Sequence, residues 1–297
     1  MPPDFLELDD GRLETAWWGP SPAEAPTVVL LHEGLGCVEL WRDMPALLAE
    51  ATGCGVFAFS RFGYGQSDPK PLPWPLTYMQ DEARDVLPHV LDAAGVREAV
   101  LLGHSDGGSI AAVHAGEAGD PRLRGLVLIA AHFFVEPANI EAIRQIRDEY
   151  QRGELRRRLA RYHRDPDIAF HGWNDSWLHP DFRGFDITAS LPGITVPILA
   201  MQGADDPYGT DAQLHVLRRH AHAPLQTILI PDARHAPHLE AKQPTLEAIA
   251  QFVARVVGRK HEQKAEKAEK APSSPGAPAF PATATCSDAG GSRCPTA

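Results

Sequence analysis

Short apolar runs recur along most of this chain, separated by amphipathic stretches. The runs that carry this pattern are TVVLL (27–31), VFAF (56–59), AVLLG (99–103), LVLIA (126–130), PILAMQG (197–203) and TILI (227–230). Continuous apolar runs of four to eight residues are typical of parallel strands that are covered on both faces. They therefore predict a largely parallel sheet buried between helices.

The stretches between these runs have helical periodicity. The clearest are residues 44–53, 79–95, 108–119 and 245–258. At the N-terminus, DFLELDD (4–10) and RLETAWWG (12–19) have the character of two antiparallel strands at one edge of the sheet. Strands alternating with helices indicate the α/β class, with a mixed, mostly parallel sheet and helices on both faces.

More than sixty residues separate the fourth apolar run from the fifth, far more than one crossover connection needs. This insertion holds two helical patterns, 137–153 and 154–165, and a Trp-rich segment after them. Its aromatic residues are Phe133, Phe134, Phe170, Trp173, Trp177 and Phe182. We therefore expect an ordered helical cap over residues 132–193, inserted into a core domain of residues 1–131 and 194–260.

The composition changes abruptly after residue 260. Residues 261–297 begin with charge repeats and continue with Pro, Ala, Ser and Gly. Such a segment cannot bury enough apolar surface to offset its conformational entropy. We expect a disordered tail there, in which the EKAEKA portion could be helical.

Charge and cysteine content exclude several classes of function. The net charge of −11 argues against a nucleic-acid partner and disfavours an anionic membrane. No apolar run approaches the ~20 residues of a membrane span, and the N-terminus lacks a basic segment leading into an apolar one, so we expect a cytoplasmic protein. The cysteines (Cys37, Cys54, Cys286 and Cys294) have no ligand spacing, which indicates free thiols and no metal site.

The sequence Gly103-His104-Ser105-Asp106-Gly107 matches G-x-S-x-G and lies between a predicted strand and a predicted helix. In that context the serine occupies a sharp strand-to-helix turn, with its hydroxyl exposed as a nucleophile. The following helix would direct its first amides, beginning with the N–H of Asp106, at an anionic intermediate on the serine. The alternative is a simple turn of small residues.

Five segments together resemble the signature segments of the α/β-hydrolase superfamily, in order and in spacing. They are LLHEGLG (30–36), SRFGYGQSD (60–68), GHSDGG (103–108), QGADDPYGT (202–210) and ARHAPHLE (233–240), and the resemblance covers residues 5–258. It implies an eight-stranded sheet, a nucleophile elbow, and an acid and a histidine on later loops. It also implies that the N–H of Gly34 is a second oxyanion donor, although Glu33 stands where the usual segment has glycine.

The order of nucleophile, acid and histidine restricts the remaining catalytic candidates. His235 follows the last predicted strand by a short loop and is the expected base, with His238 as an alternative. In the G-x-x-D pattern after Gly203, Asp206 is the expected acid, with Asp205 beside it. The acid would hold the imidazole in the correct tautomer and stabilise its positive charge.

Candidates for substrate contact come from the predicted cap and its entrance. His132 stands at the entrance, while Trp173 and Trp177 belong to the aromatic and polar segment GWNDSWL (172–178). Packing for stability is the alternative for each of them. Arg61 and Tyr64 could also approach the pocket, although a Gly-rich turn is the simpler interpretation of their segment.

The expected reaction is hydrolysis of a small carboxylic ester or lactone through an acyl-enzyme, without a cofactor. The same fold hosts thioesterases and C–C bond hydrolases, and a non-catalytic ligand-binding member is the alternative from another class. A small molecule is the expected partner, and the sequence leaves a homo-oligomer open.

Overall fold

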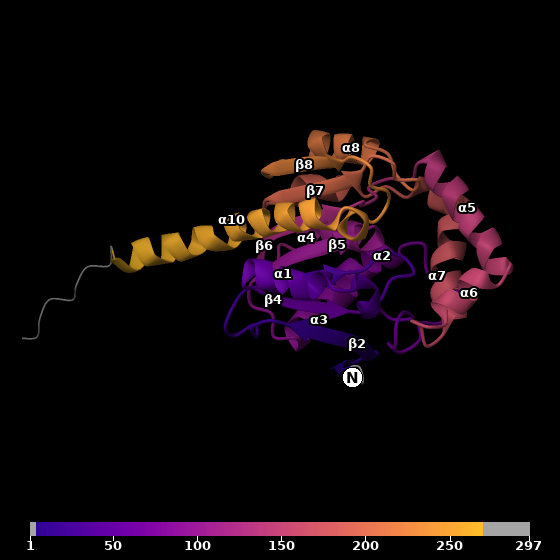
Figure 1. Cartoon of the computed structure of the whole chain (residues 1–297), viewed down its shortest axis with the longest axis horizontal. Helices are drawn as coiled ribbons and strands as arrows, with labels where there is room; N and C mark the ends of the chain where they lie inside the picture. The colour runs from indigo at the N-terminus through magenta and orange to yellow at the C-terminus, as the bar shows by residue number, and fades with distance from the viewer. Residues whose placement is uncertain (1–3, 270–297) are drawn as a thin grey trace, which may run out of the picture. The chain divides into compact units, whose positions relative to one another are not determined.

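The computed structural model describes residues 4–269, of which 259–269 are described only as helix, and residues up to 260 form one compact unit. Its centre is an eight-stranded sheet with the order β1-β2-β4-β3-β5-β6-β7-β8 (Figure 1). The strands are β1 (Asp4–Leu8), β2 (Gly11–Trp18), β3 (Thr27–Leu31), β4 (Gly55–Phe59), β5 (Ala99–His104), β6 (Leu123–Ile129), β7 (Ile198–Gly203) and β8 (Leu225–Ile230). Strands β3 to β8 run parallel, while β2 is antiparallel to both β1 and β4.

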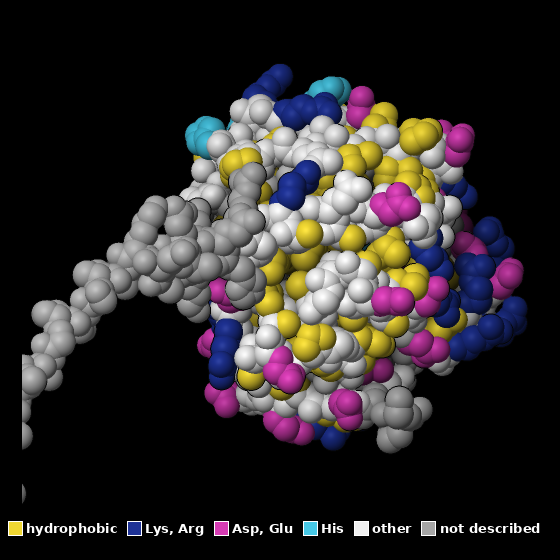
Figure 2. All heavy atoms as spheres, turned by 60° about the vertical axis from the view of Figure 1, so that its left-hand side comes forward, with side chains coloured by type: hydrophobic (Ala, Val, Ile, Leu, Met, Phe, Trp, Pro, Cys, Tyr) yellow, Lys and Arg dark blue, Asp and Glu magenta, His cyan; other side chains and the backbone are white. Residues whose placement is uncertain are grey.

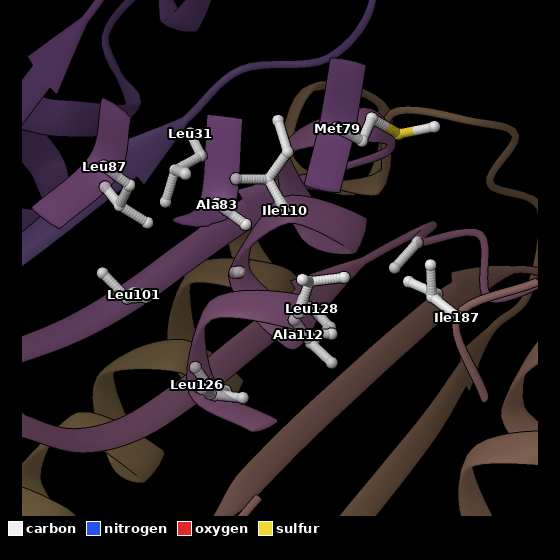
Figure 3. Close-up of a cluster of buried hydrophobic side chains, with 14 of the residues drawn as sticks. Leu31, Met79, Ala83, Leu87, Leu101, Ile110, Ala112, Leu126, Leu128 and Ile187 are labelled. Atoms are coloured by element: carbon white, nitrogen blue, oxygen red, sulfur yellow. The ribbon is translucent and has the colours of Figure 1, made fainter. Parts of the chain in front are cut away.

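Helices cover both faces of this sheet, because alternate residues of each buried strand point to opposite sides. Leu101 of β5 belongs to one apolar core and Leu102 belongs to the other. The first core lies beneath α2 (Tyr78–Asp81), a π-helical turn (Glu82–Val86), α3 (Leu87–Ala93), α4 (Asp106–Glu117) and α8 (Ala212–His220). Figure 3 shows part of it, with Ile110 of α4 near Leu31 and Ala83. The second core lies beneath α1 (Met44–Thr52) and α10 (Lys242–Glu269).

Residues between β6 and β7 form three helices, α5 (Pro137–Gln151), α6 (Glu154–Leu159) and α7 (Pro166–Leu178). Two 3₁₀ turns follow, Pro180–Gly184 and Thr188–Gly193. The Trp-rich segment therefore belongs to a helix of its own, which begins at an Asp165 cap that accepts from the N–H groups of Asp167 and Ile168. In Figure 1, α5, α6 and α7 lie together on one side of the sheet. A small apolar cluster of Tyr150, Leu155, Leu159 and Phe170 packs these three helices against one another.

Two helix ends differ from the sequence-based boundaries. Helix α4 begins at Asp106, two residues before the expected start, so the helix follows Ser105 directly. Helix α10 extends to Glu269 and so includes residues 261–269 of the predicted tail, while residues 270–297 lie outside the described part. Two short elements remain. Helix α9 (Pro237–Glu240) precedes α10, and a 3₁₀ turn (Val38–Trp41) precedes α1.

The described surface mixes charge with apolar groups. Figure 2 shows one face on which acidic and basic side chains are interspersed with hydrophobic ones. Among the described residues, no helix combines the length and apolar character that a membrane crossing requires. Cys37 and Cys54 are buried free thiols, and the other two cysteines lie outside the described residues.

Candidate active site

Ser105 occupies a strained turn between β5 and α4. Its backbone has φ = 52° and ψ = −119°, a region that non-glycine residues rarely adopt. Hydrogen bonds hold it there, because its N–H donates to the Ile129 carbonyl at 2.8 Å and its carbonyl accepts from the Gly108 N–H at 2.8 Å. Strain that the surrounding structure maintains in this way is a recurring property of functional sites, and this turn has the form of a nucleophile elbow.

The glycines on either side of Ser105 allow three backbone segments to meet. A Cβ atom on Gly107 would lie 2.0 Å from the Leu31 carbonyl oxygen at the end of β3. A Cβ atom on Gly103 would lie 2.2 Å from the Gly107 carbonyl oxygen. Real Cβ atoms do not approach backbone so closely, so β3, β5 and α4 can cross here only because both positions lack side chains.

His235 and Asp206 form a close pair on the loops after β8 and β7. The Nδ1 of His235 lies 3.0 Å and 2.8 Å from the two carboxylate oxygens of Asp206, whose side chain is fully buried. The Tyr208 N–H also donates to this carboxylate at 2.8 Å. Burial alone would raise the pKa of Asp206, but the hydrogen bond and charge of His235 outweigh it and lower that pKa. The carboxylate therefore stays ionised and keeps a proton on Nδ1.

The two alternative residues lie elsewhere. The Asp205 side chain is exposed. Its backbone N–H donates a hydrogen bond to the Ala233 carbonyl at 2.9 Å. The His238 ring is buried against Trp41 and His104, at ring-centroid distances of 5.2 Å and 4.7 Å. Neither residue lines the cavity that contains Ser105.

Ser105 and His235 line one cavity of about 130 Å³ between the sheet and the inserted helices. Gly34 and Asp106, the two residues expected to supply oxyanion donors, line it as well. Asp106 is the first residue of α4, where a backbone N–H has no intrahelical acceptor. The remaining lining residues are Glu33, Leu35, His132, Asn139, Ile143, Ile146, Leu155, Trp173, Trp177 and Tyr208.

The three side chains expected to contact substrate all reach this cavity. Trp173 and Trp177 come from α7, and Trp173 packs directly on Gly34 in the loop after β3, the expected oxyanion loop, since a Cβ on Gly34 would lie 2.2 Å from its Nε1. His132 stacks on His235 at 5.8 Å and meets Trp177 edge-on at 5.3 Å. Burial, and then the charge of His235, lower the pKa of His132 to about 3, so this ring is neutral near pH 7.

Comparison with known proteins agrees with this geometry. A family model described as the Alpha/beta hydrolase family matches residues 28–248, about three quarters of the chain. The chain belongs to the alpha/beta hydrolase family. Within it, the chain is 28% identical over 221 residues to a bifunctional esterase/perhydrolase from Acinetobacter calcoaceticus, covering 64% of this chain and 76% of that protein. It is 27% identical over 231 residues to a non-heme chloroperoxidase from Streptomyces lividans, covering 66% and 80% respectively.

A solved structure supports the fold of this alpha/beta hydrolase. The thermophilic esterase from Thermogutta terrifontis superposes with a TM-score of 0.67 at 21% identity, covering 86% of this chain and 100% of the esterase. Among the described residues of this family member, no group of three or more His, Cys, Asp or Glu side chains is arranged to hold a metal ion.

Contacts that the sequence did not predict join three segments around the cavity of this alpha/beta hydrolase. His104 Nε2 donates to the His235 carbonyl at 2.8 Å, and its Nδ1 lies 3.3 Å from a carboxylate oxygen of Glu33. Burial favours a neutral ring, but the Glu33 carboxylate outweighs it and raises the pKa of His104. Burial would likewise raise the pKa of Glu33, yet the imidazolium lowers it. Both ring nitrogens face acceptors, so His104 links the loop that carries Glu33 to the loop that carries His235.

A second buried hydrogen-bond network lies behind the cavity of this alpha/beta hydrolase. Tyr78 donates to the Asp106 carboxylate at 2.6 Å, and Trp177 Nε1 donates to the Tyr78 hydroxyl at 3.1 Å. Arg61 donates to the Glu33 carbonyl at 3.1 Å and lies 4.0 Å from Asp106. Arg61 and Tyr64 therefore lie behind the oxyanion loop, with the guanidinium 4.8 Å above the Tyr64 ring, and do not line the cavity.

Proposed function

We propose that this alpha/beta hydrolase cleaves a small carboxylic ester or lactone with Ser105 as nucleophile, His235 as general base and Asp206 as the acid that orients it. The observation that carries the proposal is the shared cavity, which is lined both by a serine on a strained strand-to-helix turn and by an imidazole whose Nδ1 is held by a buried carboxylate. The similarity to an esterase/perhydrolase supports the same reaction class.

The geometry suits acyl transfer. With Nδ1 bound to Asp206, the His235 Nε2 is the nitrogen that accepts the Ser105 hydroxyl proton as the oxygen attacks the ester carbonyl. The negative charge that develops on the carbonyl oxygen would be stabilised by the N–H groups of Gly34 and Asp106 and by the positive end of α4. His235 then returns the proton to the leaving alkoxide, and water hydrolyses the acyl-enzyme by the same proton path in reverse.

The size of the cavity sets the size of the substrate. At about 130 Å³ it is smaller than the pockets that hold drug-sized ligands, and the apolar side chains of Ile143, Ile146 and Leu155 close one side of it. A short acyl group, or a small lactone ring, fits this space. Long-chain lipids do not.

The test is a panel of 4-nitrophenyl esters from acetate to dodecanoate, combined with labelling by a fluorophosphonate. We expect turnover of the short esters, labelling of the wild-type protein, and loss of both in Ser105→Ala with unchanged circular dichroism, because only the attacking oxygen is removed. A Ser105→Ala protein that keeps a tenth of the wild-type rate would refute the proposal. Absence of labelling and turnover in the wild type would instead favour a ligand-binding member of the family.

A further inference from the structure

The cavity holds three side chains whose hydrogen-bonding nitrogens have no partner within the described residues. They are the indole Nε1 of Trp173, which is not itself a fully buried atom, and two fully buried atoms, the amide Nδ2 of Asn139 and the ring Nδ1 of His132. Their exposed fractions are 8%, 0% and 3%. Buried polar groups in folded proteins are almost always hydrogen-bonded, and an unpartnered one costs free energy. Two buried groups of this kind and one further free donor therefore line a cavity that can bind a hydrogen-bond acceptor.

The two indoles of the cavity make the contrast clear. The N–H of Trp177 is satisfied, because it donates to the Tyr78 hydroxyl at 3.1 Å. The N–H of Trp173 has no acceptor in the described chain, and its ring, which is 8% exposed against 1% for Trp177, lies against Gly34 beside the proposed oxyanion site. An indole nitrogen can only donate, so its missing partner must be an acceptor.

The orientation of the Asn139 amide is fixed by its surroundings. Its Oδ1 accepts from the Glu136 N–H in the capping box of α5, at 2.5 Å. A backbone N–H cannot accept, so the atom facing it must be the oxygen, and Nδ2 must be the amide atom that is left without a partner. Nδ2 is likewise a donor only. The neutral ring of His132 supplies one further N–H in either tautomer.

The charges around the cavity exclude an anionic partner. Its lining residues contain no Lys or Arg, whereas they include the carboxylates of Glu33 and Asp106. Glu33 is bound to His104 and the Oδ2 of Asp106 to Tyr78, while the Oδ1 of Asp106 is buried without a partner, so a second negative charge there would be repelled. A buried carboxylate on the substrate would find no cation, which is costly, while a purely hydrocarbon acyl chain would leave the donors unsatisfied.

We infer that the substrate carries, in its acyl part, a second and uncharged carbonyl oxygen that accepts hydrogen bonds from Trp173 and Asn139. His132 supplies a third donor beside them. The inference rests on the proposed function, whose reacting carbonyl would occupy the oxyanion site. A sphere with the volume of this cavity is only about 6 Å across, so an acyl group whose second oxygen lies two to four bonds from the reacting carbon fits within the space that these donors line.

The kinetic test compares esters that differ only in this oxygen. The 3-oxobutanoate and 4-oxopentanoate esters of 4-nitrophenol are set against butanoate and pentanoate, each rate being divided by that for hydroxide-catalysed hydrolysis. We expect at least one oxo ester to exceed its parent by about tenfold or more in normalised kcat/KM, because only it satisfies the buried donors. The anionic hydrogen glutarate ester should fall below pentanoate. Equal normalised values for both pairs would overturn the inference while leaving the proposed function intact.

Variants assign the effect to particular atoms. Trp173→Phe removes the free N–H, and Asn139→Asp keeps the oxygen that caps α5 but replaces the donor, so each should lower the oxo-to-parent ratio severalfold. Trp177→Phe is the matched control, because its N–H is already bound to Tyr78, and it should keep the ratio even if both rates fall. A ratio that falls equally in Trp177→Phe would show that ring packing, and not the free N–H, sets the preference.

A binding measurement is independent of turnover. In ¹⁵N-labelled Ser105→Ala protein, the indole signal assigned to Trp173 with Trp173→Phe should move downfield on titration with ethyl 4-oxopentanoate. It should not do so with ethyl pentanoate, and the Trp177 signal should serve as the internal reference. A Trp173 signal that responds alike to both esters, or to neither, would reject the subsite even if the wild type hydrolyses no ester.

Discussion

Asp205 and Asp206 are neighbours in the chain but have opposite environments. The Asp206 carboxylate is fully buried and contacts His235 at 2.8 Å, while the Asp205 side chain is exposed to solvent. Successive side chains on a tight loop point in different directions, so only one of them can reach the imidazole. The chemical consequences of removing each charge should therefore differ strongly.

We expect Asp206→Asn to lower kcat on a short ester by at least a hundredfold, because an amide can no longer hold His235 in the tautomer that accepts the serine proton. Asp205→Asn should change kcat less than tenfold. Steady-state kinetics of both variants, with circular dichroism as the check on folding, gives the comparison. The reverse order would assign the acid to Asp205.

Gly34 is expected to tolerate no side chain. A methyl group there would lie 2.2 Å from Trp173 Nε1, so either the oxyanion loop or α7 must move. We expect Gly34→Ala to reduce kcat/KM by at least tenfold with little change in circular dichroism, because displaced donors stabilise the transition state poorly. The double variant Gly34→Ala/Trp173→Ala should recover part of this loss on plain esters. A fully active Gly34→Ala protein would place the second oxyanion donor elsewhere.

At the scale of elements, the apolar runs predicted the sheet well because strands buried on both faces need continuous hydrophobic sequence. The prediction of the helical insertion was less complete. The sequence indicated a Trp-rich segment where the structure has helix α7. The aromatic residues of α7, of which Phe170, Trp173 and Trp177 are buried, obscure its amphipathic pattern. Local sequence could likewise not reveal that Asn139 and Tyr208 line the cavity, since each reaches it through packing between distant segments.

The sequence predicted the catalytic candidates for a different reason. Ser105, Asp206 and His235 follow β5, β7 and β8, and the carboxyl ends of parallel strands meet at one edge of a sheet. The sequence could not predict the contacts that support these residues. The interactions of Glu33 with His104 and of Tyr78 with Asp106 join residues 71 and 28 positions apart, and no local pattern marks them.

The crossing of β3 and α4 gives a prediction about stability. Gly107→Ala would place a Cβ atom 2.0 Å from a backbone oxygen that cannot move without disturbing β3. We expect a loss of about 3 kcal/mol, which corresponds to a fall in Tm of roughly 6–12 °C for a domain of this size. Gly184→Ala is the matched control, because nothing lies within 4 Å of its Cβ position. Similar Tm values for the two variants would contradict the tight crossing.

At the scale of the whole molecule, several buried histidines make stability depend on pH. Burial lowers the pKa of His132 and His238 to about 3 and that of His163 to about 4, and it lowers the pKa of His32 well below 6.5. Between pH 6.5 and about 4 the unfolded chain therefore binds protons that the folded chain does not. Stability must fall as the pH falls through this range, by about 1.4 kcal/mol per pH unit for each such histidine.

We expect the urea midpoint to decrease markedly between pH 7 and pH 5, with the steeper part below pH 6.5. His104 opposes this trend, because its raised pKa favours the folded state at low pH, and so do Glu82 and Asp106, whose pKa values are raised by burial; we expect the four histidines to outweigh them. His238→Gln should make the dependence shallower, whereas the exposed His222→Gln should leave it unchanged. A midpoint that stays constant over these two pH units would contradict neutral burial of these rings.

The residues proposed to carry the reaction and those proposed to select the substrate come from separate stretches of the chain. Ser105, Asp206 and His235 lie on loops of the sheet, whereas Asn139, Trp173 and most apolar walls of the cavity come from the helices between β6 and β7. One uninterrupted segment therefore supplies most of the apolar wall of the cavity, and we expect its exchange between relatives to change which substrates are accepted. The exchanged segment must pack against Gly34 as the Trp173 ring does, and a chimera that lacks this contact should lose the cavity wall there.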